Sequence, residues 1–407
     1  MVPTLDGGAR FVACLAALAR QRPAPAGLVV IDSGSRDGTV AAARAAGAHV
    51  IEIPPAEFDH GATRNLGAAA LPGVDVLVFL VQDAVPQGED CLAALAAAAL
   101  GPGVAAATAR QVPPAEAGPL TASSVCAGLF GGAEPRAVGP FTPVQRDGMA
   151  PEEWRGQLLL DDVCCALRAP LFRAVGGYRR TSHGEDALMA FDLLCGGWAL
   201  AFEPAAVVEH GHAYDARTVV PRYRADARFF REAFGFRARP DLLSVLKGYN
   251  AELSRDRRFL SAHGEWLGGR PLSAVLSGAR ALRWAQVMAQ RDGSRGALGR
   301  LPVPRPVPAP GALSGASPGA LPPALDGTLP GALLPDATPG TRAPRAATGA
   351  GKDAAQNPTV ATTGASKEPA RETGGPAAGG PSASRPAAAG RLSTPRGKPR
   401  APGKGGR

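Results

Sequence analysis

Residues 28–39 read LVVIDSGSRDGT: a short apolar run ends in Asp32, and a turn rich in Gly and Ser follows. A second apolar run, at 76–81, leads into Gln82 and Asp83. Short apolar runs bounded by turn residues predict buried strands of a parallel sheet. Ligands of open α/β sheets bind beyond the carboxyl ends of the strands. The two acidic residues therefore predict a site at that edge, suited to a nucleotide diphosphate and its metal ion.

Helical and strand-like segments alternate along the first hundred residues, and this alternation predicts an α/β fold with a mostly parallel sheet flanked by helices. Helices are expected at 9–20, 39–46, 62–71 and 89–99, and strands at 28–31, 49–53 and 74–81. The pattern weakens over 101–160, where Gly and Pro abound. Beyond it we expect strands at 163–167 and 199–202, and helices at 185–195, at 217–234 and within 242–290.

The composition changes near residue 300. Residues 301–407 are mostly Pro, Ala, Gly, Ser and Thr, with no aromatic residue. Such a segment buries too little apolar surface to offset its ordering entropy, so we expect a disordered tail. The tail carries 13 Lys and Arg against 5 Asp and Glu, which is +8 of the chain's net charge of +9. It is expected to be a solvated extension, and no specific nucleic-acid partner is expected.

The six cysteines form no Cys-x-x-Cys pair, a usage typical of a reducing compartment and not of a disulfide framework or a zinc site. The chain opens without the apolar segment of a signal peptide. It also has no uninterrupted apolar run of about 18 residues, the length of a transmembrane helix. We therefore expect a cytoplasmic protein.

The strand ends offer oxygen ligands, although each motif is weak when taken alone. Asp32 could accept hydrogen bonds from a nucleotide, or it could simply form an Asx turn. Asp83 could bind Mg²⁺, which takes one or two carboxylates plus phosphate oxygens. Arg64, between them in sequence, could contact a phosphate in a bidentate manner, or it could form a surface salt bridge.

Two further groups follow later in the chain. Glu185 and Asp186 open a predicted helix, where acidic residues commonly complement the helix dipole; one of them could instead be a general base. His210 and His212 are two residues apart, so in an extended segment their side chains point the same way. One of the imidazoles could complete a metal site with Asp83, or either could be a hydrogen-bonded structural residue.

Taken in order, these elements resemble the inverting family 2 of GT-A glycosyltransferases, in particular its rhamnosyltransferase-like branch. The resemblance covers about residues 1–235. It is carried by PTLDGG (3–8), IDSGSRDGT (31–39), FDHGATRN (58–65), QDAVP (82–86), ARQ (109–111), GED (184–186) and EPAAVVEHGH (203–212).

The resemblance implies a fold, a reaction and a set of site residues. The expected fold is GT-A, a Rossmann-like sheet flanked by helices, over 1–235, with a helical extension at 236–300 and the tail at 301–407. The expected reaction is metal-dependent transfer, with inversion, from a dTDP-, UDP- or GDP-sugar to a glycan or lipid-linked acceptor. The expected nucleotide-sugar ligands are Thr4, Asp32, Ser35, Arg64, Gln82 and Asp83. Asp83, His210 and His212 would bind Mg²⁺ or Mn²⁺, and Asp186, beside Glu185, would be the general base.

The sequence departs from the family pattern in two places. The strand that normally precedes Pro3-Thr4 is nearly missing, and its loss would remove a central ladder beside the nucleotide site. Val81 stands where the first acid of the family's Asp-x-Asp motif is usual, a change that the Gln-Asp-Ala branch shares.

Two alternative functions stay open. One is a catalytically inactive module that binds a sugar nucleotide or a glycan, and the short first strand motivates it. The other is a nucleotidyltransferase, for which the loop at 7–10 is a weak match.

The Arg-rich helix at 217–234 leaves a second question open. It could rest on the anionic inner face of the membrane, or it could pack its phenylalanines on the domain and expose its arginines.

Overall fold

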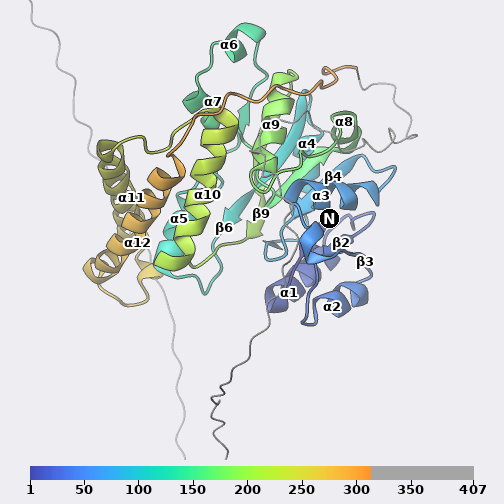
Figure 1. Cartoon of the computed structure of the whole chain (residues 1–407). Helices are drawn as coiled ribbons and strands as arrows, with labels where there is room; N and C mark the ends of the chain where they lie inside the picture. The colour runs from blue at the N-terminus through green and yellow to red at the C-terminus, as the bar shows by residue number, and fades with distance from the viewer. Residues whose placement is uncertain (313–407) are drawn as a thin grey trace, which may run out of the picture. The chain divides into compact units, whose positions relative to one another are not determined.

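The computed structural model describes residues 1–312 (Figure 1). The strands are β1 (Val2–Thr4), β2 (Val29–Asp32), β3 (His49–Glu52), β4 (Val76–Leu80), β5 (Val85–Pro86), β6 (Val104–Val112), β7 (Arg136–Val138), β8 (Cys164–Arg168) and β9 (Ala199–Glu209). The helices are α1 (Gly8–Ala19), α2 (Thr39–Ala45), α3 (His60–Ala69), α4 (Cys91–Ala99), α5 (Pro119–Cys126), α6 (Pro143–Asp147), α7 (Pro151–Gln157), α8 (Ala169–Ala174), α9 (Glu185–Cys195), α10 (Ala216–Phe234), α11 (Leu242–Ala262) and α12 (Leu272–Gly293).

The strands form a mostly parallel sheet, as expected. β1, β2 and β3 pair in parallel in the order β1-β2-β3, and a second group has the order β4-β8-β6-β9-β5, with β7 on β9. Two backbone hydrogen bonds join the groups: the Met1 amine donates to the Val78 carbonyl, and the Leu80 amide donates to the Met1 carbonyl. This is the pattern of a parallel pair. β8, β5 and β7 run opposite to the rest.

The ladder at β1 is present although the strand is short. Val2, Pro3 and Thr4 pair with Val30, Ile31 and Asp32. The expected loss of a central ladder is therefore not observed. As a consequence Thr4 stands directly beside Asp32, at the carboxyl edge where the site was predicted.

Both faces of the sheet are buried, which explains the uninterrupted apolar runs of its strands. Val29 and Ile31 of β2 face a core with Phe79, Trp154 and the apolar residues of α8 and α9. Val30, between them, faces the opposite core, to which α1 and α4 contribute Phe11, Cys14, Leu15, Leu18, Cys91 and Leu95. This alternation follows from the two-residue period of a strand.

The predictions were least accurate over 101–160, where β6 was missed, and at β9, which is 11 residues long and was expected at 199–202. β6 begins Val-Ala-Ala-Ala-Thr, and its small residues lack the β-branched signal of a strand. β9 contains Pro204, which argues against a central strand. The register with β6 shifts between Ala109/Glu203 and Arg110/Val207, so the proline lies in a bulge.

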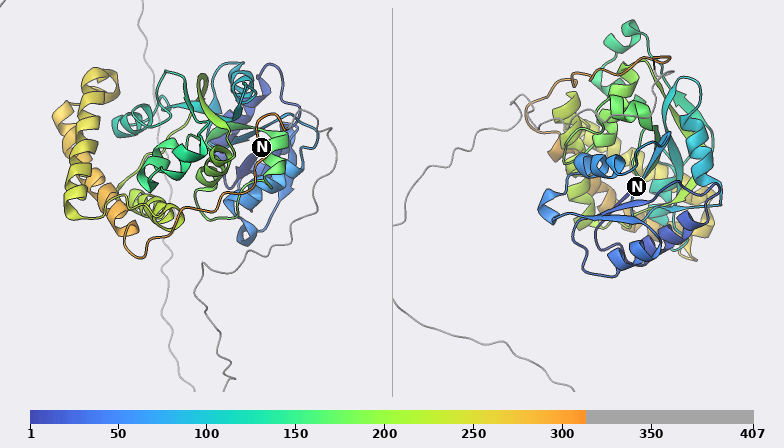
Figure 2. Two further views of the ribbon diagram at one scale, coloured as in Figure 1. Left: turned by 90° about the horizontal axis from the view of Figure 1, so that it is seen from above. Right: turned by 90° about the vertical axis from the view of Figure 1, so that its right-hand side faces the viewer.

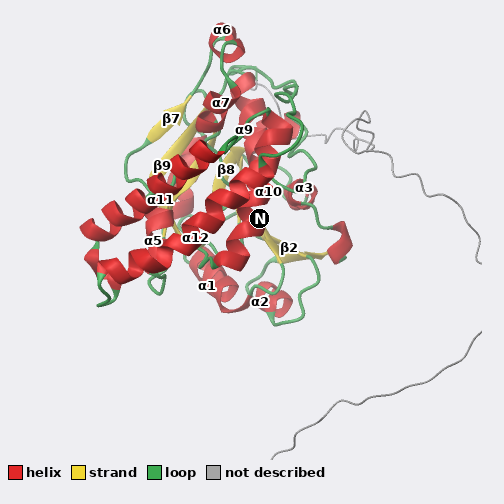
Figure 3. Ribbon diagram, turned by 60° about the vertical axis from the view of Figure 1, so that its left-hand side comes forward, coloured by secondary structure: helices red, strands yellow, loops and turns green. Residues whose placement is uncertain are grey.

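Helices α11 and α12 occupy the span where a helical extension was expected, and they lie at the end away from β2 and β3 (Figures 1 and 2). A buried ion pair joins them: Arg283 Nε is 2.8 Å from Asp256 Oδ2, and Ser123 of α5 donates to the same carboxylate. Helix α10 packs on α12 in front of β9 (Figure 3). Within residues 1–312 no helix is both long and apolar enough to span a bilayer.

Residues 301–312, at the start of the predicted tail, follow α12 and lie across α9 (Figure 1). Arg305 Nε donates to Asp192 Oδ2 at 2.8 Å, and the Pro308 carbonyl accepts from Trp198 Nε1 at 2.7 Å. Asp192 is fully buried and also binds Arg179 at 2.6 Å. A buried carboxylate with two guanidinium partners explains why these first residues are ordered. Residues 313–407, the rest of the predicted tail, lie outside the described residues.

Ending the chain after Arg300 should lower the free energy of unfolding by about 1–3 kcal/mol, because Asp192 loses the Arg305 bonds. Ending it after Ala312 should not. Urea unfolding of the two shortened chains beside the full chain measures the difference. Equal stability of both shortened chains would contradict a structural role of 301–312.

Candidate active site

The floor of the site is a network between the loops that follow β1 and β2. Asp32 is 1% exposed, and its Oδ1 accepts from the backbone N–H groups of Gly34 and Ser35 at 3.0 and 2.8 Å. Its Oδ2 accepts from the hydroxyls of Thr4, at 2.9 Å, and Ser35. A carboxylate offers about four acceptor positions, and here the protein fills them. The structure thus brings Thr4, Asp32 and Ser35 together, with the Asp32 carboxylate shaping the loop.

Gln82 ties this floor to the end of β4. Its Oε1 accepts from the Leu5 amide at 2.9 Å, and its Nε2 donates to the Leu5 carbonyl at 3.1 Å. The next residue, Asp6, has a φ of 46° and accepts from the Arg36 amide at 2.7 Å. The left-handed region is unfavourable for residues other than Gly, so these bonds hold a strained loop in place beside Asp83.

Asp83, His210 and His212 form a cluster that could hold a metal ion. Their potential ligand atoms all lie within 4.8 Å of one another. Asp83 Oδ2 is 3.8 Å from His210 Nε2 and 3.6 Å from His212 Nδ1. The side chain of His212 is 52% exposed and that of Asp83 is 26% exposed, so the cluster is open to solvent on one side. A carboxylate and two imidazoles are ligands that suit a divalent transition-metal ion such as Mn²⁺.

A hydrogen-bonded chain orients His210 toward Asp83. Gln111 Nε2 donates to Asp161 Oδ2 at 3.0 Å, and Gln111 Oε1 lies 3.3 Å from His210 Nδ1. A carboxylate can only accept, which fixes the amide orientation, so Nδ1 of His210 carries the proton and Nε2 presents its lone pair to the cluster. Burial lowers the pKa of His210, against the opposing charge of Asp83, and favours this neutral form.

Arg10 of α1 contacts the chain on both sides of the same cluster. Its guanidinium donates to the Asp83 carbonyl and to the Glu209 carbonyl, both at 3.1 Å, and it binds the Glu209 carboxylate at 2.6 Å. It therefore fixes the ends of β4 and β9 relative to each other, and with them Asp83 and His210.

Arg64 lies apart from this cluster, in a buried group of acids. Its Nε is 3.0 Å from Asp162 Oδ2 and its Nη1 is 2.8 Å from Glu185 Oε1. All three residues are at most 6% exposed. Burial opposes the charge of Arg64, but the carboxylates of Asp162 and Glu185 raise its pKa. The guanidinium is therefore engaged in a buried salt bridge. Neither of the roles considered from the sequence, a phosphate contact or a surface pair, describes this geometry.

The two acidic residues at the start of α9, Glu185 and Asp186, lie in different environments. Glu185 is buried on Arg64, and its pKa is raised to about 7 by burial and by Asp162, with Arg64 acting in the opposite direction. Asp186 is half-buried and has no salt bridge among the described residues. Burial and the nearby charges of Glu185, Asp162 and Asp161 raise its pKa well above the usual range. Asp186 is thus the carboxyl of the pair that could accept a proton from a substrate.

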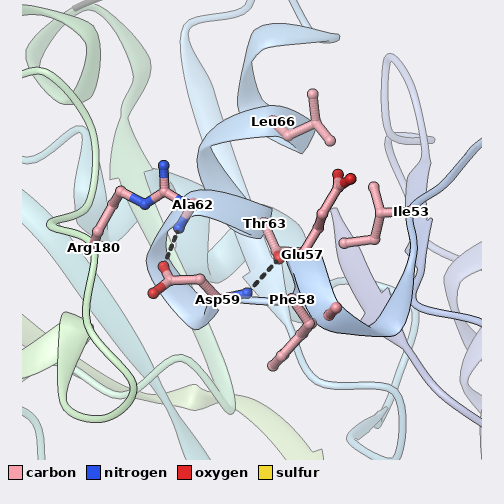
Figure 4. Close-up of a pocket in the computed structure, with 9 residues that line it drawn as sticks. Ile53, Glu57, Phe58, Asp59, Ala62, Thr63, Leu66 and Arg180 are labelled. Atoms are coloured by element: carbon pink, nitrogen blue, oxygen red, sulfur yellow. Dashed lines mark hydrogen bonds between the residues drawn. The ribbon is translucent and has the colours of Figure 1, made fainter. Parts of the chain in front are cut away.

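A cavity of about 480 Å³ lies on another face of α3 (Figure 4). Phe58, Thr63, Leu66 and Arg180 are among its lining residues, and Asp59 accepts from the Ala62 amide at its edge. The side chains of the motif at 58–65 therefore lie on two different faces of α3. Residues 59, 62, 63 and 66 line the cavity, whereas His60 and Arg64 approach Glu185.

The sequence predictions missed four residues that position the site: Arg10, Gln111, Asp161 and Asp162. A signal existed for some of them. Gln111 ends one of the motifs that carried the resemblance, and two acids directly precede the predicted strand at 163–167. Nothing in the sequence distinguished Arg10 from other helix-surface arginines.

Replacing Arg64 by Met should destabilise the fold by about 3–5 kcal/mol, because Asp162 and Glu185 would stay buried without their cation. The matched control is Arg44→Met. Arg44 pairs with Glu52, and both side chains are more than half exposed, so its loss should cost less than about 1 kcal/mol. Urea unfolding curves of the two variants give the comparison. Equal losses would mean that the buried group does not hold the site together.

Comparison with known proteins identifies the family. Residues 1–124 match Glycosyl transferase family 2. The O-antigen chain rhamnosyltransferase RfbN of Salmonella typhimurium is 31% identical over 225 residues, which cover 55% of this chain and 69% of that protein. WbaN of Salmonella anatum, also an O-antigen chain rhamnosyltransferase, matches with the same identity and coverage. Among solved structures, the mannosyltransferase PcManGT of Pyrobaculum calidifontis, in complex with GDP-Man and Mn²⁺, is 18% identical. That alignment covers 71% of this chain and 84% of that chain, with a TM-score of 0.43.

The matched segment contains the floor of the site and Asp83, and the relatives extend the similarity well beyond it. The fold is the GT-A type that the resemblance implied. The chain belongs to glycosyl transferase family 2 and is a glycosyltransferase.

Proposed function

We propose that this enzyme transfers a sugar, with inversion, from a nucleotide-activated donor to a hydroxyl of a glycan or lipid-linked acceptor. The observation that carries the proposal is the cluster of Asp83, His210 and His212 beside the β1 and β2 loops. The relatives named as O-antigen chain rhamnosyltransferases make a nucleotide-activated rhamnose the first donor to test.

In this proposal the nucleotide lies on the floor formed by Thr4, Asp32, Ser35 and Gln82. The internal bonds of Asp32 assign it mainly to shaping that floor, and the exposed edge near Leu5 and Gln82 offers contacts to the base or ribose. Arg64 contributes indirectly, since it binds Glu185 and not Asp186, whose Oδ1 accepts a hydrogen bond from the Ala187 amide at 2.7 Å.

Asp83, His210 and His212 would hold a divalent cation. When bound, such a cation offsets charge on the departing nucleoside diphosphate. Magnesium prefers oxygen ligands in octahedral geometry, whereas imidazole suits transition metals. Two imidazoles beside one carboxylate therefore favour Mn²⁺ over Mg²⁺.

Asp186 would be the general base that takes the proton of the acceptor hydroxyl. Its raised pKa makes it a stronger base than an ordinary aspartate, which suits proton transfer near neutral pH. Glu185 would act as a positioning residue because its carboxylate is bound to Arg64.

We place the reaction in the cytoplasm. The six cysteines are all free, as is usual in a reducing compartment. The arginine-rich helix α10 buries Phe229 and Phe234 in the core, so its aromatic side chains are not available to a bilayer. Three arginines of α10 are exposed: Arg222, Arg224 and Arg228. A peripheral interaction with the membrane would therefore be an electrostatic contact of these arginines with its anionic face.

The inactive binding module is the weaker alternative. Its motivation was the short first strand, and the ladder of β1 with β2 removes it. The open cluster at Asp83 and the half-buried Asp186 favour an enzyme.

Thermal shifts with dTDP-, UDP- and GDP-sugars, measured with and without Mn²⁺, test the donor site. We expect one donor to raise the melting temperature of the full chain only when Mn²⁺ is present, because the cation links the diphosphate to Asp83. Asp83→Asn should lose this metal-dependent shift. His263→Ala should keep it, since His263 lies on the surface beside Glu265. A shift that survives in Asp83→Asn would place the cation elsewhere.

Asp186→Asn should lower the turnover rate by about 100-fold or more while donor binding is retained, as expected for loss of a general base. Turnover is measured as release of nucleoside diphosphate with the donor found above. Asp147→Asn, on the surface with a side chain that is 72% exposed, is the control and should be neutral. Unchanged turnover in Asp186→Asn would rule out this residue as the base.

A further inference from the structure

A second pocket, lined by arginines, lies between the end of α12 and the loop that joins α10 to α11. Its volume is about 240 Å³. The lining residues are Arg237, Arg239, Pro240, Arg291, Ser294, Arg295 and Gly296. Four of them are guanidinium groups and none is acidic. None of them belongs to the active site described above.

The positive charge of this pocket is only partly neutralised. Among residues 1–312, no carboxylate lies within ion-pair distance of Arg237, Arg239 or Arg291. Arg295 is paired with Asp292 at 3.3 Å, but Asp292 also binds Arg224 at 3.4 Å. Glu252, whose charge acts on Arg239, forms an ion pair with Arg255. Burial and the nearby charge of Arg155 lower the pKa of Arg239, although Glu252 acts in the opposite direction.

Two of these arginines, Arg237 and Arg239, are bonded to the loop that follows α12. Arg237 Nη2 donates to the Gly296 carbonyl at 2.7 Å, and the Arg239 amide donates to the Ser294 hydroxyl at 3.3 Å. Arg239 lies against Gly248 of α11: a Cβ at that glycine would be 2.4 Å from Arg239 Nε. A glycine inside a helix is less favourable than alanine, and here it makes room for the arginine. Arg239 Nε is buried and has no hydrogen-bond partner.

We propose that this pocket binds a phosphate-bearing group. Guanidinium groups bind phosphate oxygens in a bidentate manner, and several unpaired arginines around one cavity repel each other until an anion enters. Pockets for drug-sized ligands have volumes of about 300–1,000 Å³. This pocket, at about 240 Å³, is smaller and fits a phosphate or diphosphate moiety. That moiety is either a soluble anion or the headgroup of an anionic lipid. The inference is independent of the proposed sugar transfer.

The experiment measures binding by the full chain to two kinds of probe. Calorimetric titration with inorganic phosphate and with pyrophosphate covers the soluble source. Co-sedimentation with phosphatidylglycerol–phosphatidylcholine vesicles, compared with pure phosphatidylcholine vesicles, covers the lipid source. The pocket variant is Arg237→Gln/Arg291→Gln. The matched control is Arg257→Gln/Arg258→Gln, which removes the same charge from exposed positions of α11.

A third variant, Gly248→Ala, keeps every charge and displaces the Arg239 guanidinium. We expect at least one probe to bind, and both the pocket variant and Gly248→Ala to weaken that binding about tenfold or more. The control should change it less than about twofold. Circular dichroism verifies that each variant is folded.

Each outcome decides the proposal. Pocket-dependent binding of the soluble anions identifies a soluble ligand, and pocket-dependent binding of the anionic vesicles alone identifies a lipid headgroup. Equal losses in the pocket and control variants would mean general attraction between opposite charges and would overturn the proposal. So would a Gly248→Ala variant that is folded and binds like the wild type, or no binding of any probe.

Discussion

The burial of Arg64 between Asp162 and Glu185 is the interaction on which the acid end of the site depends. It joins three segments that are far apart in sequence: helix α3, the entry to β8 and the start of α9. Removing three charged groups from water is unfavourable unless they satisfy each other, so their positions are interdependent. Tyr178 adds a hydrogen bond to Asp162 and anchors the group in the aromatic core with Phe79 and Phe172. The start of α9, and with it Asp186, is fixed by these contacts.

The proposed metal-binding end of the site, at Asp83, His210 and His212, is held together by other contacts. Asp83 follows β4 and the two histidines follow β9, two strands that β8 and β6 separate in the sheet, and Arg10 and Gln111 hold the ends of these strands in place. Asp161 connects the two ends: it binds Gln111, which orients His210, and its charge also raises the pKa of Asp186. A change in the charge of Asp161 would therefore alter the pKa of both His210 and Asp186.

Much of this arrangement could be predicted from the sequence, and the rest could not for identifiable reasons. The strands before Asp32 and Asp83 are apolar and β-branched, so both segments were correctly predicted as strands. β6 begins with small residues and was missed, and β9 contains a proline in a bulge, so only its beginning, at 199–202, was predicted. The cluster of Asp83, His210 and His212 was predicted and is observed. Arg64 was assigned to the nucleotide because its partners, Asp162 and Glu185, approach it only through tertiary packing.

The excess of carboxyl groups at the site favours the divalent cation that we propose there. Asp83, Asp161, Asp162, Glu185 and Asp186 place five carboxyl groups around one edge of the sheet, and the guanidinium of Arg64 contacts two of them. Two responses are available to such an excess: carboxyl groups take up protons, or a cation binds. The raised pKa values of Glu185 and Asp186 represent the first response at the buried end. At the open end, Asp83 is partly exposed and faces the lone pair of a neutral imidazole, an arrangement that favours the divalent cation proposed above. Burial and neighbouring carboxylates therefore raise the pKa of the proposed base, whereas the proposed metal ligands lie at the end of the site that is open to solvent.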